Sequence, residues 1–281
     1  MLNLIRGLAQ RPLSLIGTII VLLFVLIAIF GPLIAPYGFN EQIRDETGRL
    51  MRFAPPSLAH PFGTDGDSFD VFSRILWGAR EIMILPGIAT VISVLLGTII
   101  GLTIGYLGGW LDEVVSRLMD SLLSVPALVL ALVMLGTIGP SNVGIVVVVV
   151  LLYTPIVTRV IRSATLNIRD LGYVEAAKLR GESTAYILFR EIFPAVLPAL
   201  TVEAALRFSY AIFLIASLGF LGLGVQPPSP DWGRMVKTGQ ETFARQPWTM
   251  WAPAAAIALL VIGVNLMADG LRRIFRYDGS M

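Results

Sequence analysis

Long apolar runs alternate with shorter polar segments along this chain, and the alternation predicts helices that cross a membrane. An α-helix needs about 20 apolar residues to span the hydrocarbon core of a bilayer, and six runs of roughly that length or more carry almost no charge. We expect spans at 13–34, 80–106, 114–138, 143–162, 195–222 and 250–270. The fold class is therefore an all-α membrane protein with six transmembrane helices.

The polar segments divide between the two sides of the membrane. An even number of spans puts both chain ends on one side, and that side carries more Lys and Arg, which is typical of cytoplasmic segments. We expect segments 1–12, 163–194 and 274–281 to be cytoplasmic. Segments 35–79 and 223–249 are then external, and the later spans form one core over 80–273.

Composition narrows the class of protein further. Of the 281 residues, 56% are hydrophobic and 14% are charged, whereas soluble domains carry roughly 25% charged residues. The net charge of +2 gives no reason to expect a nucleic-acid partner. There is no cysteine and one histidine, which excludes thiolate chemistry and disfavours a histidine-based triad. We expect no catalytic residue and no metal site. No Gly-Lys dipeptide of a phosphate-binding loop occurs, so ATP and Mg²⁺, if used, would bind a partner rather than this chain.

Small residues and prolines mark the second to fourth spans. Gly97, Gly101 and Gly105 recur every four residues, and such a stripe lets another helix approach closely. The neighbouring helix belongs either to this chain or to a second subunit. The prolines of these spans either kink helices that line a cavity or serve packing alone; they are Pro86, Pro126 and Pro155.

Two opposite charges lie within the fifth span. Glu203 and Arg207 stand four residues apart and so share one helix face. A charge at the bilayer centre costs about 3 kcal/mol on insertion scales, so such a pair usually faces protein or water. Either it lines a translocation path, or it is an internal ion pair that stabilises packing.

The polar insert 163–194 predicts two short helices outside the bilayer. Residues 173–180 favour a helix, Gly181 suits its end, and a second helix is expected over 183–193. Pro194 then begins the fifth span, where proline is tolerated in the first helical turn. Small Ala176 and Ala177 would let the backbone of a partner come close. The alternative is an ordinary loop on the membrane surface.

The insert also carries a motif. Glu175-Ala176-Ala177, followed by Gly181 and then by Pro194 thirteen residues later, resembles the EAA loop of binding-protein-dependent ABC importer permeases. The resemblance implies a coupling helix that inserts into a cleft of an ATPase subunit. The docking residues it implies are Tyr173, Glu175, Ala176, Ala177, Gly181, Glu182 and Pro194. Glu191 and Phe193 depart from the usual Ile and Leu.

Further motifs resemble the C-type subunits of oligopeptide and dipeptide permeases. They include Pro55-Pro56-Ser57, the runs 60–65 and 70–74, Gly105 to Trp110, Gly219 to Gly224, and Asp269 to Arg272. The resemblance implies a multi-pass inner-membrane permease that works with a second homologous permease subunit, two ATP-binding subunits and an external solute-binding protein. The candidate contacts with the binding protein are His60, Phe62, Asp65, Pro228 and Trp232. The alternative for these Pro- and Gly-rich runs is rigid loop structure. Ser68-Phe69 and Asp231 depart from the family pattern.

The resemblance favours import of dipeptides or oligopeptides, while relatives carry nickel, glutathione, antimicrobial peptides or sugars. Two rival classes remain. An ion-coupled secondary transporter needs buried polar groups near the midplane and often internal repeats, and only Glu203 with Arg207 approaches this. A membrane-embedded enzyme needs a catalytic constellation, which the sequence lacks.

Overall fold

The computed structural model describes residues 11–278, which form helices joined by loops. Residues 1–10 of the expected N-terminal segment and 279–281 of the expected tail lie outside this range. No β-strand occurs among the described residues, which contribute only isolated bridges in the segment 42–70. The elements are α2 Pro12–Ile34, α3 Val71–Leu107, α4 Gly109–Leu123, α5 Ala127–Ile138, α6 Asn142–Ile168, α7 Gly172–Leu179, α8 Thr184–Tyr186, the π-helix η1 Ile187–Ile192, α9 Phe193–Phe220, α10 Trp232–Glu241 and α11 Trp248–Asp278.

Five helices are long and apolar enough to cross a membrane, and a sixth span exists only if α4 and α5 count together. These two helices meet at 83°, so the expected span 114–138 is not one straight helix; it breaks next to Pro126, for which a kink was one of the two alternatives. Pro126 has no N–H to continue a helix and precedes α5 as its N-cap residue. α4 is also amphipathic, with one apolar and one charged face, which sets it apart from the apolar α5.

α3 begins earlier than predicted because a side chain caps it. The carboxylate of Asp70 accepts a hydrogen bond from the Ser73 N–H at 2.7 Å, which satisfies a donor that the first helical turn would leave open. Residues 71–79 of the segment expected to be external therefore belong to α3 and are helical. The segment expected to be a loop at 223–249 likewise contains a helix, α10.

The glycine stripe of α3 packs against α6 of the same chain. A Cβ atom added at Gly101 would lie 2.7 Å from the carbonyl oxygen of Thr158, and one at Gly97 would lie 2.6 Å from Cβ of Val157. Contacts this close require the absence of a side chain. The stripe is thus a contact inside this subunit, which was one of the two alternatives.

The fifth span does not start at Pro194. A single helical rod runs from Thr184 to Phe220, so the prediction of a separate helix over 183–193 is wrong. The turn before Pro194 is the π-helix η1, in which the Phe193 N–H donates to the carbonyl of Leu188, five residues earlier. A wider turn accommodates a proline that would otherwise collide with the preceding backbone.

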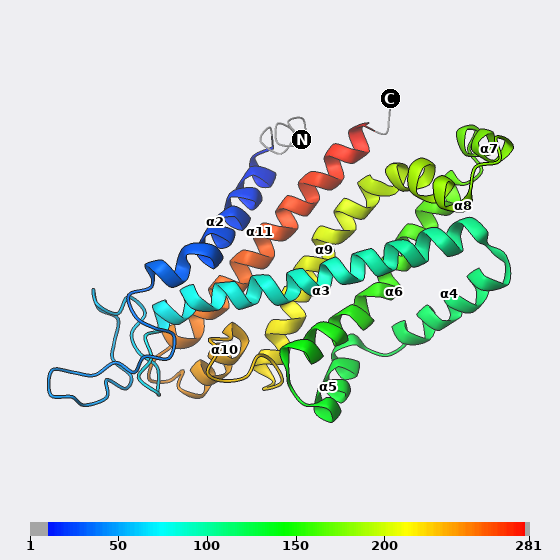
Figure 1. Ribbon diagram of the computed structural model, residues 1–281. Coiled ribbons are helices and arrows are strands. Elements are labelled where there is room, and N and C mark those ends of the chain that lie inside the picture. The colour runs from blue at the N-terminus through cyan, green and yellow to red at the C-terminus, as the bar shows by residue number, and fades with distance from the viewer. Residues whose placement is uncertain (1–10, 279–281) are drawn as a thin grey trace.

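Functional segments gather at opposite ends of the bundle (Figure 1). α7 lies at the same end as the start of α2 and the last turns of α11. The loop 37–70, α10 and α5 lie at the other end. α2 exposes most of its apolar side chains, as expected for a helix that faces lipid.

Candidate functional site

α7 is a short helix with a well-defined end. The Gly181 N–H donates to the carbonyl of Lys178 at 3.0 Å, and the Glu182 N–H donates to that of Ala177 at 3.2 Å. These two bonds form a Schellman motif, which requires a left-handed residue just after the helix. Gly181 supplies it with φ +75°. The prediction that the helix ends at Gly181 is therefore confirmed.

One face of α7 is packed into the protein. Val174 and Ala177 are fully buried and join a core cluster with Ile187 and Ile192 of η1 and Ile161 of α6. Ala177 therefore faces its own chain, and the expectation that its small size admits a partner is wrong. The burial follows from spacing, since positions three apart share one helix face.

The opposite face of α7 is exposed. It carries Tyr173, Glu175 and Ala176 of the predicted docking set. It also ends in Leu179, whose side chain is 89% exposed. The sequence analysis did not include Leu179 among the docking residues. Its signal is an apolar residue next to Lys178, Arg180 and Gly181, where exposure is expected. Gly181 and Glu182 continue this surface, and Pro194 lies apart, exposed near the start of α9.

Polar contacts fasten α7 to its neighbours. The Lys178 ammonium donates to the carbonyl of Arg169 at 3.2 Å and lies over the ring of Tyr106 at the end of α3. Such a contact satisfies an open carbonyl at the end of α6. α7 is thus linked to both α6 and α3.

Glu191, which departs from the family pattern, has a local partner. Its carboxylate pairs with the Arg180 guanidinium at 3.4 Å, which joins η1 to the end of α7. Burial raises the pKa of the Tyr173 phenol, and the charge of Glu191 adds to the increase. Glu191 thus acts on both ends of α7.

α6 also holds α4 through ion pairs. Arg162 donates from Nη2 to Asp112 Oδ2 at 2.6 Å, and Arg159 pairs with Asp120. A third arginine, Arg169, donates to the carbonyl of Gly105 at 3.1 Å. α6 is therefore the helix to which α3, α4 and α7 are all attached.

The two charges within α9 form a nearly buried pair. Arg207 Nε and Glu203 Oε1 are 2.8 Å apart, and both side chains are nearly buried. The guanidinium also lies over the rings of Tyr153 and Tyr210. Tyr153 is buried on α6, whereas Tyr210 is half exposed. The pair therefore lies between α9 and Tyr153 of α6, with Tyr210 at its exposed edge.

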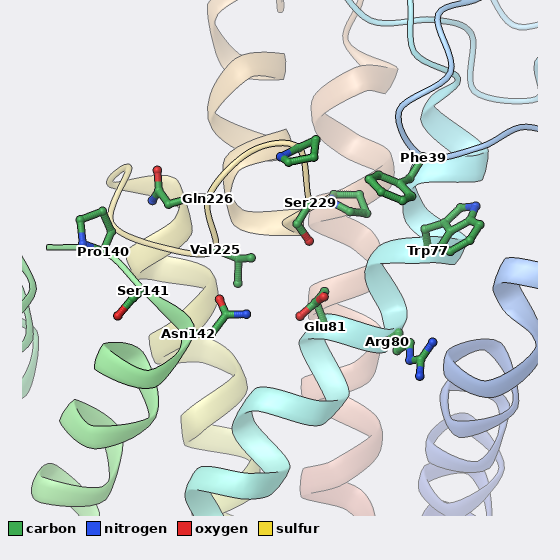
Figure 2. A pocket seen from close by; sticks show the side chains of 12 residues that line it. Phe39, Trp77, Arg80, Glu81, Pro140, Ser141, Asn142, Val225, Gln226 and Ser229 are labelled. Atoms are coloured by element: carbon green, nitrogen blue, oxygen red, sulfur yellow. The ribbon is translucent and has the colours of Figure 1, made fainter.

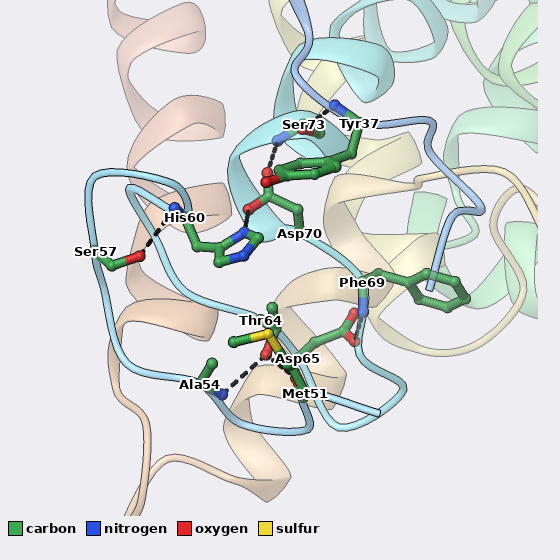
Figure 3. A network of polar contacts seen from close by, with 10 residues as sticks. All are labelled: Tyr37, Met51, Ala54, Ser57, His60, Thr64, Asp65, Phe69, Asp70 and Ser73. Carbon is green, nitrogen blue, oxygen red and sulfur yellow. Dashed lines mark hydrogen bonds and ion pairs between the residues drawn. The ribbon is translucent and has the colours of Figure 1, made fainter. Parts of the chain in front are cut away.

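The external candidates differ in accessibility. His60 is buried, its Nδ1 lies 3.0 Å from Asp70 Oδ1, and its ring stacks on Tyr37, as Figure 3 shows. Trp232 is 1% exposed and donates from Nε1 to the carbonyl of Ile75 at 3.1 Å. Both side chains are therefore part of the packed interior of their loops. In this conformation neither can contact a partner directly.

Phe62 and Pro228 are exposed at the same end of the bundle. Asp65 is partly covered; it pairs with Arg74 at 3.2 Å and accepts a hydrogen bond from the Asp67 N–H. It also accepts one from the Phe69 N–H, which Figure 3 shows. Burial raises the pKa of the Asp65 carboxyl, against the lowering effect of these partners.

Asp231, the other departure from the family pattern, caps α10. Its carboxylate accepts from the Arg234 N–H at 2.7 Å, a role that serine also fills. Burial raises the pKa of the Asp231 carboxyl, while the capping bond opposes the increase. Aspartate in place of serine at position 231 therefore preserves the N-cap of α10.

Comparison with known proteins gives consistent matches. Residues 93–277 match the family described as binding-protein-dependent transport system inner membrane component, and residues 3–56 match the N-terminal TM domain of oligopeptide transport permease C. The dipeptide transport system permease protein DppC of Alkalihalophilus pseudofirmus is 37% identical over 267 residues, which cover 95% of this chain and 86% of that protein. DppC of Escherichia coli is 40% identical over 265 residues, covering 92% and 87%.

A solved structure shows the same fold at low sequence identity. It is an inward-facing form of the MetNI methionine ABC transporter, with a TM-score of 0.59 and 18% identity over 72% of this chain and 95% of that one. The resemblance found in the sequence motifs is thus confirmed. This chain belongs to the inner-membrane permease subunits of binding-protein-dependent ABC importers, in the group of oligopeptide and dipeptide permease C subunits.

Proposed function

We propose that this permease subunit imports di- or oligopeptides and that α7 is where ATP-binding partner subunits engage it. The observation that carries the proposal is the two-sided character of α7. Its inner face is buried in the core cluster, whereas its outer face presents Glu175, Ala176 and the exposed Leu179. A helix that is fixed on one side and free on the other suits transmission of force.

The contacts of α7 suggest the route of that force. Lys178 ties α7 to the last carbonyls of α6, and α6 is in turn joined to α4 and α3 by Arg162 and Arg169. A displacement of α7 would therefore move several spans as a unit. ATP and Mg²⁺ are bound by the partners, and this chain contributes no catalytic residue.

The family implies two further kinds of partner, and the end of the bundle opposite α7 offers a surface for one of them. An external solute-binding protein would dock there, with Phe62 and Pro228 as accessible contacts. A second homologous permease subunit would complete the path, for which the half-exposed Tyr210 beside Arg207 and Glu203 is our candidate lining. Peptides are the proposed solute because the names of the similar permeases specify dipeptide or di/tripeptide transport.

Co-purification with the ATP-binding subunits tests the docking role. Glu175→Lys reverses a charge on the outer face of α7, and Gly181→Asp strains its end. Matched controls lie in the external loop, where Glu46 is exposed and Gly48 shares both positive φ and open surroundings with Gly181. We expect the α7 variants to lose the ATP-binding subunits and Glu46→Lys and Gly48→Asp to keep them. Uptake that persists without any ATPase, driven by an ion gradient, would contradict the proposal.

A further inference from the structure

A cavity of about 440 Å³ opens at the end of the bundle that lies opposite α7. Its walls come from four segments that are distant in sequence, namely Phe39 of the loop 37–70, the first turns of α3, the turn before α6, and the loop 225–230 (Figure 2). Volumes of 300–1,000 Å³ are typical of small-molecule sites. The cavity is separate from α7 and from the Glu203–Arg207 pair.

The Glu81 carboxylate lies in this cavity without a counter-charge. Among residues 11–274 it takes part in no ion pair and accepts no hydrogen bond. Figure 2 shows it near the centre, on the side of Asn142, while the neighbouring Arg80 extends away from it. A partly buried carboxylate is costly unless a cation or a donor satisfies it. Glu81 is therefore set to receive a positive group.

A second carboxylate lies behind Glu81, and the charge of Arg234 partly balances it. Asp231 is 4% exposed, and Glu81 and Asp231 both line the small gap beneath the cavity. The pKa of Asp231 is raised mainly by burial, and the charge of Glu81 contributes to the increase. Like charges in proximity disfavour each other's ionised form, and a cation beside Glu81 would remove that penalty.

The rest of the lining suits an organic cation rather than a metal ion. Trp77 and Phe39 pack together with ring centroids 5.2 Å apart, and aromatic faces attract ammonium groups. The Trp77 N–H is already used, since it donates to the carbonyl of Tyr37 at 3.3 Å. No cluster of three metal-ligating side chains occurs in the described part of the chain.

We propose that this cavity binds the α-ammonium group of an imported peptide, with Glu81 as its counter-charge, Asn142 as a polar neighbour and Trp77 with Phe39 as the aromatic wall. The inference rests on the proposed function as a peptide importer. It adds a solute contact in the membrane subunit itself, at the end where solute would arrive from outside.

Equilibrium binding of a dipeptide to the purified transporter in nanodiscs tests this site. The solute-binding protein is left out, so that the membrane subunits alone supply binding. Alanyl-alanine is compared with its N-acetyl derivative, which lacks the ammonium charge. A hydrogen bond to a charged group is worth about 1.5–3 kcal/mol, which is about tenfold or more in the dissociation constant.

In the wild type we expect alanyl-alanine to bind at least about tenfold more tightly than the acetylated peptide. Glu81→Gln should remove this preference, whereas the exposed external Glu46→Gln should keep it. A preference that survives Glu81→Gln, or no binding of alanyl-alanine at millimolar concentration, would overturn the inference.

Two further outcomes distinguish a solute contact from a contact with the solute-binding protein. If Glu81→Gln leaves peptide binding unchanged but weakens binding of the solute-binding protein to the transporter, the carboxylate contacts that protein and the inference fails. Uptake by the complete wild-type transporter is measured in parallel. If it imports no peptide, the proposed function fails; if it does and Glu81→Gln keeps the preference, only the inference fails.

Discussion

The Arg162 guanidinium of α6 and the Asp112 carboxylate of α4 are joined by a bond of 2.6 Å between Nη2 and Oδ2. Both side chains are largely shielded from solvent, with exposed fractions of 32% and 15%. The pair ties the amphipathic α4 to the helix that leads into α7. Through α6, the ion pair therefore connects the candidate docking helix α7 with α4, which meets α5 at an angle of 83°.

Breaking this pair should destabilise the permease. We expect Asp112→Asn and Arg162→Gln each to lower the melting temperature in detergent, with a coupling energy of about 1 kcal/mol in a double-mutant cycle. Glu113 and Arg117 form a matched exposed pair on α4, whose coupling should be below about 0.5 kcal/mol. Equal coupling energies for the two pairs would contradict a structural role for Arg162 with Asp112.

The end of α7 should depend on glycine at one position only. Gly181 has φ +75°, so Gly181→Ala places a side chain in a left-handed conformation at a cost of about 1 kcal/mol. The same change at Gly172, inside α7 with nothing nearby, should be neutral or stabilising. Hydrogen exchange of α7 amides measures both; faster exchange is expected for Gly181→Ala alone, and equal rates would refute a helix end that depends on Gly181.

Close packing between α3 and α6 should make Gly101 intolerant of a methyl group. Its Cβ would lie 2.7 Å from the Thr158 carbonyl oxygen, and overpacking of this kind costs about 1–3 kcal/mol. Gly136 of α5 has no such neighbour. In thermal unfolding in detergent, Gly101→Ala should lower the melting temperature and Gly136→Ala should leave it unchanged. A loss of similar size at both positions would point to glycine content rather than to the helix contact.

Asp231 should make stability fall as pH rises. Burial raises its pKa above 3.8 in the folded protein, so the folded state binds the proton more tightly than the unfolded state. Stability therefore decreases from pH 3.8 up to the raised pKa and is level above it. Asp231→Asn keeps the capping oxygen but cannot titrate, so the wild type should lose melting temperature relative to this variant over that range. A relative gain would mean that capping outweighs burial.

Some features could be predicted from the sequence because one residue type or one run length determines them. The apolar runs locate five spans, and the requirement for positive φ identifies Gly181 as the end of α7. The Gly97–Gly105 stripe predicts a close helix contact but not the identity of the neighbouring helix.

Other features depend on tertiary contacts that no local pattern reveals. Pro126 predicts a kink, but the 83° break accompanies the ion pairs of α4 with α6. The burial of Ala177 depends on how α7 is rotated against η1. His60 and Trp232 lie in Pro- and Gly-rich segments, whose composition indicates loops but not which side chains point inward. Glu81 was not singled out, because a lone carboxylate near the end of a span has no sequence signature.

Site-directed cross-linking from α7 is the sharpest test of docking by the ATP-binding subunits. The chain has no cysteine, so a single introduced cysteine can carry a benzophenone maleimide without background labelling of this chain. Ala176→Cys lies on the exposed face of α7, whereas Thr47→Cys is exposed in the loop 37–70 at the opposite end of the bundle. In the purified transporter, we predict cross-links to the ATP-binding subunits from position 176 and none from position 47. No cross-link to these subunits from position 176, or equal cross-linking from both positions, would contradict docking at α7.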